Sequence, residues 1–186
     1  MTSSTEAPGP GDRPDSTPPR RGDLLDLAIT DLARAGRGVA RHGGLVLFVE
    51  GALPGERVRA RVTGIRKAFG EARTQSILSA SSERVVPPCR HFGTCGGCDL
   101  QHLAVGAQAE AKRRQLEAAL ARIGGLQGTR VDPTVPAPAP YGYRFRMDFD
   151  WRPGPAHPIL GLHRRHSADV IVPLEECRLA GPVTAE

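Results

Sequence analysis

The chain of 186 residues contains no long hydrophobic run. Its longest aliphatic or aromatic run, Leu45–Val49, is five residues long, far short of a membrane span. It also lacks a charged start followed by an apolar segment, the pattern that directs proteins to an oxidising compartment. We therefore expect a cytoplasmic protein. Only four cysteines are present, and in that compartment they are not expected to form disulfides.

Lysine is nearly absent, with Lys67 and Lys112 as the only two, so nearly all the positive charge is arginine. A net charge of +5 and a pI near 9.5 indicate an anionic partner, and without a membrane span nucleic acid is favoured over lipid. Arginine grips phosphate with a planar fork, although a GC-rich gene would give the same bias. The 39% apolar content suits one or two small domains rather than a large enzyme.

Three of the four cysteines lie close together, as Cys89, Cys95 and Cys98, and the fourth is Cys177. A structural zinc site usually has two Cys-x-x-Cys pairs, and this chain has one, so the spacing favours a [4Fe-4S] cluster while leaving zinc open. We expect Gly96 and Gly97 to let backbone N–H groups face sulfur and to adopt angles that a Cβ forbids. The flanking histidines, His91 and His102, are not expected to be ligands, because four thiolates already fill a cluster.

From Leu24 to Leu78 the pattern is that of short strands broken by glycine. Val58, Ala60 and Val62 alternate with arginines, which predicts a half-buried strand with one positive outer face. The candidate RNA-binding residues of this region are Arg57, Arg59, Arg61, Arg66, Lys67 and Arg73. Five short strands over residues 23–80 predict a closed barrel of the OB type, preceded by a disordered tail over residues 1–22.

Residues 81–186 are predicted to form a small α+β region, so that the whole chain is mainly β with some α. A helix is expected over Ala107–Ile123, with Leu116, Leu120 and Ile123 on one face and a solvated basic turn at 112–114. A strand over Tyr143–Arg152 should place its aromatic residues on a core face and direct Arg144 and Arg146 towards RNA. Two further strands are expected over Ile159–His163 and Asp169–Leu174.

The cysteine motif, from Pro88 to Leu103 with the distal Cys177, resembles that of the 23S rRNA (uracil-5-)-methyltransferase family. The resemblance implies that Cys89, Cys95, Cys98 and Cys177 bind a [4Fe-4S] cluster. Residues 31–40 and 49–56 resemble the two turn motifs of a TRAM domain, which implies an RNA-binding barrel. Residues 143–177 are similar to the family's central domain, although Leu162-His163 and Arg178 depart from its usual residues.

Enzymes of that family methylate uracil with a free nucleophilic cysteine and S-adenosylmethionine. Here every cysteine belongs to the cluster motif, and only nine residues follow Cys177. We therefore expect the RNA-recognising part of such an enzyme, truncated before its methyltransferase domain and not competent alone, with S-adenosylmethionine bound only in the full-length enzyme. The expected partner is large-subunit ribosomal RNA.

The sequence leaves two alternatives open. The first is a standalone TRAM-type RNA-binding adaptor with a structural iron–sulfur or zinc site. The second is a radical S-adenosylmethionine methylthiotransferase, but those enzymes need Cys-x3-Cys-x2-Cys, and five residues separate Cys89 from Cys95.

Overall fold

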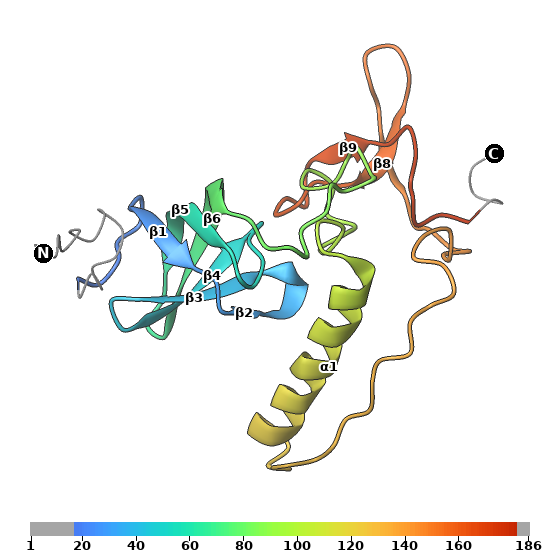
Figure 1. Ribbon diagram of the computed structural model, residues 1–186. Coiled ribbons are helices and arrows are strands. Elements are labelled where there is room, and N and C mark those ends of the chain that lie inside the picture. Colours follow the sequence, from blue (N-terminus) through green and yellow to red (C-terminus); the bar gives the residue numbers. More distant parts are fainter. Residues whose placement is uncertain (1–16, 182–186) are drawn as a thin grey trace, which may run out of the picture. The chain divides into compact units, whose positions relative to one another are not determined.

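The computed structural model describes residues 17–181, and the chain divides into two compact units between Ser82 and Glu83 (Figure 1). Residues 1–16 of the predicted tail lie outside the described residues. The remaining tail residues, 17–22, are part of the first unit: Pro19 is buried, and the backbone N–H of Gly22 donates to the carbonyl of Val62 at 2.9 Å. The prediction of a disordered tail is therefore wrong for residues 17–22.

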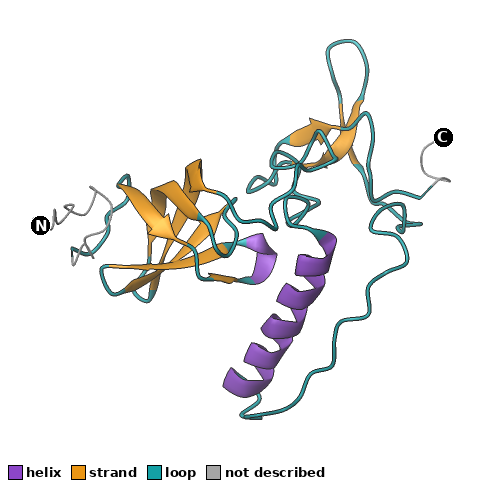
Figure 2. Ribbon diagram, in the orientation of Figure 1, coloured by secondary structure: helices purple, strands orange, loops and turns teal. Residues whose placement is uncertain are grey.

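The first unit is a six-stranded β-sheet in the order β1-β5-β6-β4-β3-β2, with a short 3-10 helix, η1, at Arg34–Gly36 (Figure 2). Neighbouring strands are antiparallel except for the parallel pair β4 and β6. The strands are β1 (Leu24–Ala28), β2 (Asp31–Leu32), β3 (Gly38–His42), β4 (Leu45–Glu50), β5 (Arg57–Ile65) and β6 (Phe69–Ser79).

The predicted barrel-like, mainly β fold is confirmed, with six strands in place of five. The first predicted strand is divided at Ile29 and Thr30, so that β1 pairs with β5 while β2 pairs with β3. The backbone N–H of Thr30 also donates to the carbonyl of Val39 at 2.8 Å. One continuous segment therefore reaches both edges of the sheet, as expected for an OB-type barrel.

The core of this unit follows the predicted alternation. Val58, Ala60 and Val62 on β5 are buried, while the arginines between them are exposed. Neighbouring segments contribute alanine and branched aliphatic side chains, which fill the barrel interior. The central cluster is Leu27, Ile29, Ala40, Leu47, Val49, Ala52, Val58, Ala60 and Ala72.

The second unit combines one α-helix, α1 (Val105–Arg122), with a three-stranded antiparallel sheet in the order β7-β8-β9 (Figure 2). The strands are β7 (Asp150–Arg152), β8 (Ile159–His163) and β9 (Ile171–Pro173). The predicted helix is confirmed within two residues at its start and one at its end. Among the described residues, no helix is long and apolar enough to cross a membrane.

The apolar face predicted for the helix is not buried. None of the 18 residues of α1, all of which are described, is classed as buried, and Ile123 just beyond it is 88% exposed. The periodicity of Leu116 and Leu120 predicted the helix correctly, but neither side chain is buried.

The strand predicted over Tyr143–Arg152 is largely wrong. Only Asp150–Arg152 pairs with a neighbouring strand, and residues 143–149 have no sheet face on which aromatic side chains could be buried. Phe145 is 79% exposed and Trp151 is 61% exposed, whereas Met147 and Phe149 are half-buried, so the predicted face is not a continuous core face.

Candidate metal centre and nucleic-acid interface

The four cysteines line one small cavity of about 30 Å³ in the second unit, and all four carry free thiols. They therefore meet in space although Cys177 lies 79 positions beyond Cys98 in the sequence. Burial raises the pKa of the Cys98 thiol, a hydrogen bond with Gln101 lowers it, and the charges of the other three cysteines raise it again. Each of the other thiols is thus close enough to Cys98 to influence its ionisation.

The loop that carries Cys95 is fixed against the end of β8. The backbone N–H of Gly96 donates to the carbonyl of His163 at 3.0 Å, and that of Arg165 donates to the carbonyl of Thr94 at 2.8 Å. These two bonds extend the sheet pattern onto the loop, which places the buried Cys95 beside the strand that leads, through β9, to Cys177.

The two glycines of the motif allow neighbouring atoms to lie close to the backbone. The backbone N–H of Gly97 donates to Sγ of Cys95 at 3.4 Å, as predicted. A Cβ on Gly96 would lie 3.1 Å from the carbonyl oxygen of His163, and one on Gly97 would lie 3.2 Å from Leu162. Neither glycine has a positive φ, so the predicted need for left-handed angles is wrong here; Gly93, at φ 84°, has that conformation.

Two residues that sequence reasoning did not single out hold the cysteine loop. The buried Gln101 accepts a hydrogen bond from the backbone N–H of Cys89 at 3.2 Å, in addition to its bond with Cys98. Arg165 forms an ion pair with Asp99 at 2.9 Å and donates to the backbone carbonyl of Cys98. The only signal for Gln101 was its place three residues after the third cysteine, within the motif.

The flanking histidines differ in their position. His91 lines the cavity, and its buried Nε2 has no hydrogen-bond partner within residues 17–181. His102 is buried and packs its ring against Phe92, with centroids 5.2 Å apart. In the described part of the chain, no three His, Cys, Asp or Glu side chains are placed to hold one metal ion together.

The predicted RNA-binding residues of the barrel are all exposed, but several are already paired. Arg59 binds both carboxylate oxygens of Asp26, at 2.6 and 2.7 Å, and Arg73 binds Glu50 at 2.9 Å. Arg61 donates to the carbonyl of Gly22 at 3.0 Å. The side chains of Arg66 and Lys67 form no hydrogen bond or ion pair with residues 17–181, which leaves them available to a ligand.

In the second unit, Arg144 and Arg146 also differ. Arg146 lies 3.3 Å from Asp148, and both side chains are strongly exposed. Arg144 lines the four-cysteine cavity, and its guanidinium has no hydrogen-bond or ion-pair partner among the described residues. Arg144 is therefore the better placed of the two for an anionic ligand.

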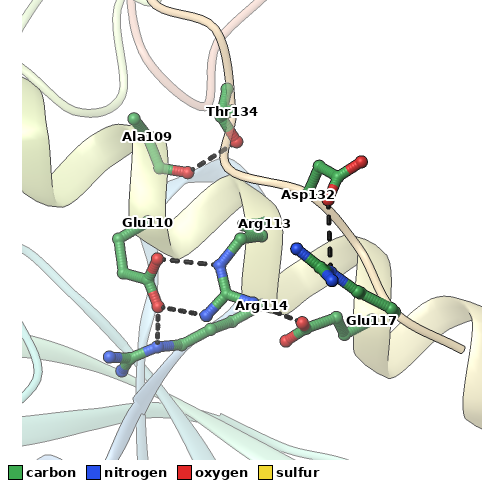
Figure 3. Close-up of polar contacts among 8 residues, drawn as sticks. Ala109, Glu110, Arg113, Arg114, Glu117, Asp132 and Thr134 are labelled. Carbon is green, nitrogen blue, oxygen red and sulfur yellow. Dashed lines mark hydrogen bonds and ion pairs between the residues drawn. The ribbon is translucent and has the colours of Figure 1, made fainter. Parts of the chain in front are cut away.

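The basic turn of α1 is compensated by acidic neighbours one turn away (Figure 3). Arg113 binds Glu110 at 2.8 Å and also Glu117, and Arg114 binds Glu110 at 2.9 Å. Hydrogen bonds from Arg113 and then Arg114 lower the pKa of Glu110 to about 2. This arrangement confirms that the turn is a solvated surface of the helix.

Comparison with known proteins relates the chain to RNA-modifying enzymes. Residues 19–74 match the TRAM domain family. The 23S rRNA (uracil(1939)-C(5))-methyltransferases of Halomonas elongata and Acidithiobacillus ferrooxidans are 47% and 46% identical over 160 and 155 residues. These alignments cover 84% and 83% of this chain, but 32% and 35% of the relatives.

A solved structure of an RNA methyltransferase is also similar to this chain. The crystal structure of the Pyrococcus abyssi tRNA (uracil-54, C5)-methyltransferase in complex with S-adenosyl-L-homocysteine has a TM-score of 0.59 and 28% identity. The match covers 86% of this chain and 34% of that one. The chain thus spans about a third of the length of the relatives it matches. Residues 19–74 are therefore a TRAM domain, and the chain as a whole is similar to one third of an RNA (uracil-C5)-methyltransferase.

Proposed function

We propose that the chain is the RNA-recognising, cluster-carrying part of an S-adenosylmethionine-dependent RNA (uracil-C5)-methyltransferase that acts in the cytoplasm. The observation that carries this proposal is the meeting of Cys89, Cys95, Cys98 and Cys177 in one cavity of a chain similar to such enzymes. Large-subunit ribosomal RNA is the proposed substrate, because the relatives named for 23S rRNA are more similar in sequence than the relative named for tRNA.

The four cysteines fit a [4Fe-4S] cluster. Four thiols from two distant segments line one cavity, and the chain has only one Cys-x-x-Cys pair, whereas a structural zinc site usually has two. A backbone N–H already faces the sulfur of Cys95, as is common around cluster sulfurs. A bound cluster would supply metal–sulfur bonds that join the cysteine loop to the segment after β9.

The second unit joins these segments with hydrogen bonds and ion pairs but with little buried apolar surface. Its buried apolar side chains are few: Cys95, Leu103, Ile171, Val172 and Leu179 among the described residues. Small domains with so little buried apolar surface commonly depend on metal or disulfide bonds for stability. We therefore assign the cluster a structural role.

The metal content tests this assignment. Protein purified without oxygen is expected to contain iron and labile sulfide in a one-to-one ratio and to lose both in Cys177→Ser. That variant should also be cleaved faster by protease within residues 83–181, with residues 19–74 still protected. Thr94→Ala, which changes an exposed neighbour of Cys95, is the matched control and should retain iron. Zinc in place of iron, or an unchanged cleavage pattern in Cys177→Ser, would contradict the assignment.

The proposed RNA partner is tested by its dependence on salt. Phosphate contacts release counterions, so the affinity for a 23S rRNA fragment should fall steeply as salt rises, by about 0.7 log units per contact for each log unit of salt. Transfer of a methyl group from S-adenosylmethionine is not expected from this chain alone, because we place the cofactor site and the nucleophile in the remaining two thirds of a longer enzyme. Methylation of the fragment by the isolated chain would contradict that placement.

A further inference from the structure

A second cavity, of about 190 Å³, lies next to the four-cysteine cavity in the second unit. The two cavities share the lining residues Gly97, Cys98, Gln101, Arg144 and Leu179. We call the second one the tyrosine cavity, because Tyr141 and Tyr143 line it. It is large enough for a small planar ligand and opens beside the proposed cluster.

The polar residues of the tyrosine cavity fall into two groups. Asp99 is neutralised by Arg165 at 2.9 Å, and the side-chain amide of Gln108 donates to the carbonyls of Leu100 and Leu103 at 3.1 and 2.8 Å. These groups are satisfied within the protein. In contrast, the side chains of Tyr141, Tyr143 and Arg144 have no hydrogen-bond or ion-pair partner within residues 17–181.

The wall that carries these three residues is held by the segment after Cys177. The backbone N–H of Gly142 donates to the carbonyl of Arg178, and that of Arg144 donates to the carbonyl of Leu179, both at 2.9 Å. The N–H of Gly181 in turn donates to the carbonyl of Arg144 at 2.8 Å. Cys98 to Gln101 also line the cavity, so two of its lining segments are directly connected to cysteines of the motif.

Two phenol rings and one unpaired guanidinium form a set that suits a nucleotide. An aromatic ring stacks on a base of any identity, and a guanidinium binds phosphate through a planar pair of donors. Unstacked bases of single-stranded RNA are the usual partners of such sites. We propose that the tyrosine cavity binds one unstacked nucleotide of single-stranded RNA, with its base against Tyr143 and its phosphate against Arg144. This inference rests on the proposed RNA-binding function.

Photochemical crosslinking of the whole chain tests the cavity directly. Single-stranded RNA that carries 5-iodouridine is bound to the anaerobically purified protein, irradiated, and mapped by mass spectrometry of the linked peptides. A crosslink at Tyr141 or Tyr143 is expected. Crosslinks restricted to residues 19–74, or to the more exposed Phe145 and Trp151, would overturn the cavity proposal and leave RNA binding intact. Absence of any RNA binding would contradict the proposed function itself.

Substitutions give a second, quantitative test. Tyr143→Ala should weaken RNA binding by about 5- to 150-fold, the range expected for loss of one stacked base. Phe145→Ala, in the same segment but outside the cavity, is the matched control and should bind like the unchanged protein. An abasic nucleotide at the crosslinked position should weaken RNA binding by the unchanged chain. It should not weaken RNA binding by Tyr143→Ala any further. Equal losses in both alanine variants would overturn the proposal, and if Tyr143→Ala fails to fold, the crosslink map decides.

Discussion

Arg59 on β5 lies directly opposite Asp26 on β1 and donates a hydrogen bond to each of its carboxylate oxygens, at 2.6 and 2.7 Å. The hydrogen bond from Arg59 lowers the pKa of Asp26, so this carboxylate stays ionised at neutral pH. Arg59 therefore lies in the middle of the basic face of β5 with its charge compensated. Any phosphate that binds there competes with Asp26.

This competition predicts that Asp26→Asn strengthens RNA binding. The change removes the ionic partner of Arg59 and leaves its guanidinium free for phosphate, which should raise both the affinity and the steepness of its salt dependence, by up to about one phosphate contact. Binding is measured by fluorescence anisotropy of a labelled RNA fragment at several salt concentrations. The control is Asp31→Asn, which removes one negative charge from β2, away from Arg59. An equal gain in both variants would indicate a general charge effect instead.

The barrel could be predicted from sequence because its pattern and its burial arise within one compact unit. The alternation from Arg57 to Val62 gave both the strand and its buried face correctly. The pairing of Arg59 with Asp26 could not be predicted in the same way, since it depends on the register between strands whose residues are 33 positions apart. Sequence reasoning therefore found the basic face but not which of its charges are available.

The second unit was harder to predict, for a different reason. The alternation from Tyr143 to Arg152 predicts which side chains share a face. It does not predict whether another strand pairs with the segment, or whether other residues cover that face. Within residues 143–149, only Arg144 pairs with another segment, through a single isolated bridge to Ala180, and Tyr143 and Phe145 remain exposed. The prediction that Cys177 lies with the other three cysteines likewise came from resemblance to a family. The spacing of the cysteines alone left zinc open as the bound metal.

The buried carboxylate of Glu56 predicts a strong effect on barrel stability. Its two oxygens accept hydrogen bonds from the backbone N–H of Leu53 at 2.8 Å and of Ser81 at 3.3 Å, and the residue is 1% exposed. Glu56→Ala leaves these donors without this acceptor, which should lower the free energy of unfolding by about 2–3 kcal/mol. Glu56→Gln retains one carbonyl oxygen as an acceptor, so its free energy of unfolding should fall by less than that of Glu56→Ala. Urea denaturation of the barrel is the measurement, and equal stability of the alanine variant and the unchanged protein would refute the role.

The ion pairs of α1 predict a pH dependence. The pKa of Glu110 is lowered to about 2 from an ordinary value of 4.5, so its stabilising contribution is complete above about pH 4.5 and is lost as the pH falls towards 2. Glu110→Gln should therefore reduce the helical signal in circular dichroism at neutral pH, and the difference from the unchanged protein should vanish near pH 2. Asp132→Asn, which removes a neighbouring carboxylate that pairs with Arg130 outside the helix, is the control. A difference that persists at pH 2 would mean that the substitution acts through something other than charge.

Gly161 in β8 predicts that a single methyl group can disrupt the cysteine cavity. A Cβ at this position would lie 1.9 Å from the carbonyl oxygen of Val172, and a backbone atom of a paired strand cannot move aside without displacing β9. Since β9 leads to Cys177, Gly161→Ala should lower the iron content and speed proteolysis within residues 83–181. Gly106→Ala, in the first turn of α1 with open space around its Cα, is the matched control and should stabilise the helix slightly. Normal iron content in Gly161→Ala would show that β9 adjusts independently of the segment that carries Cys177.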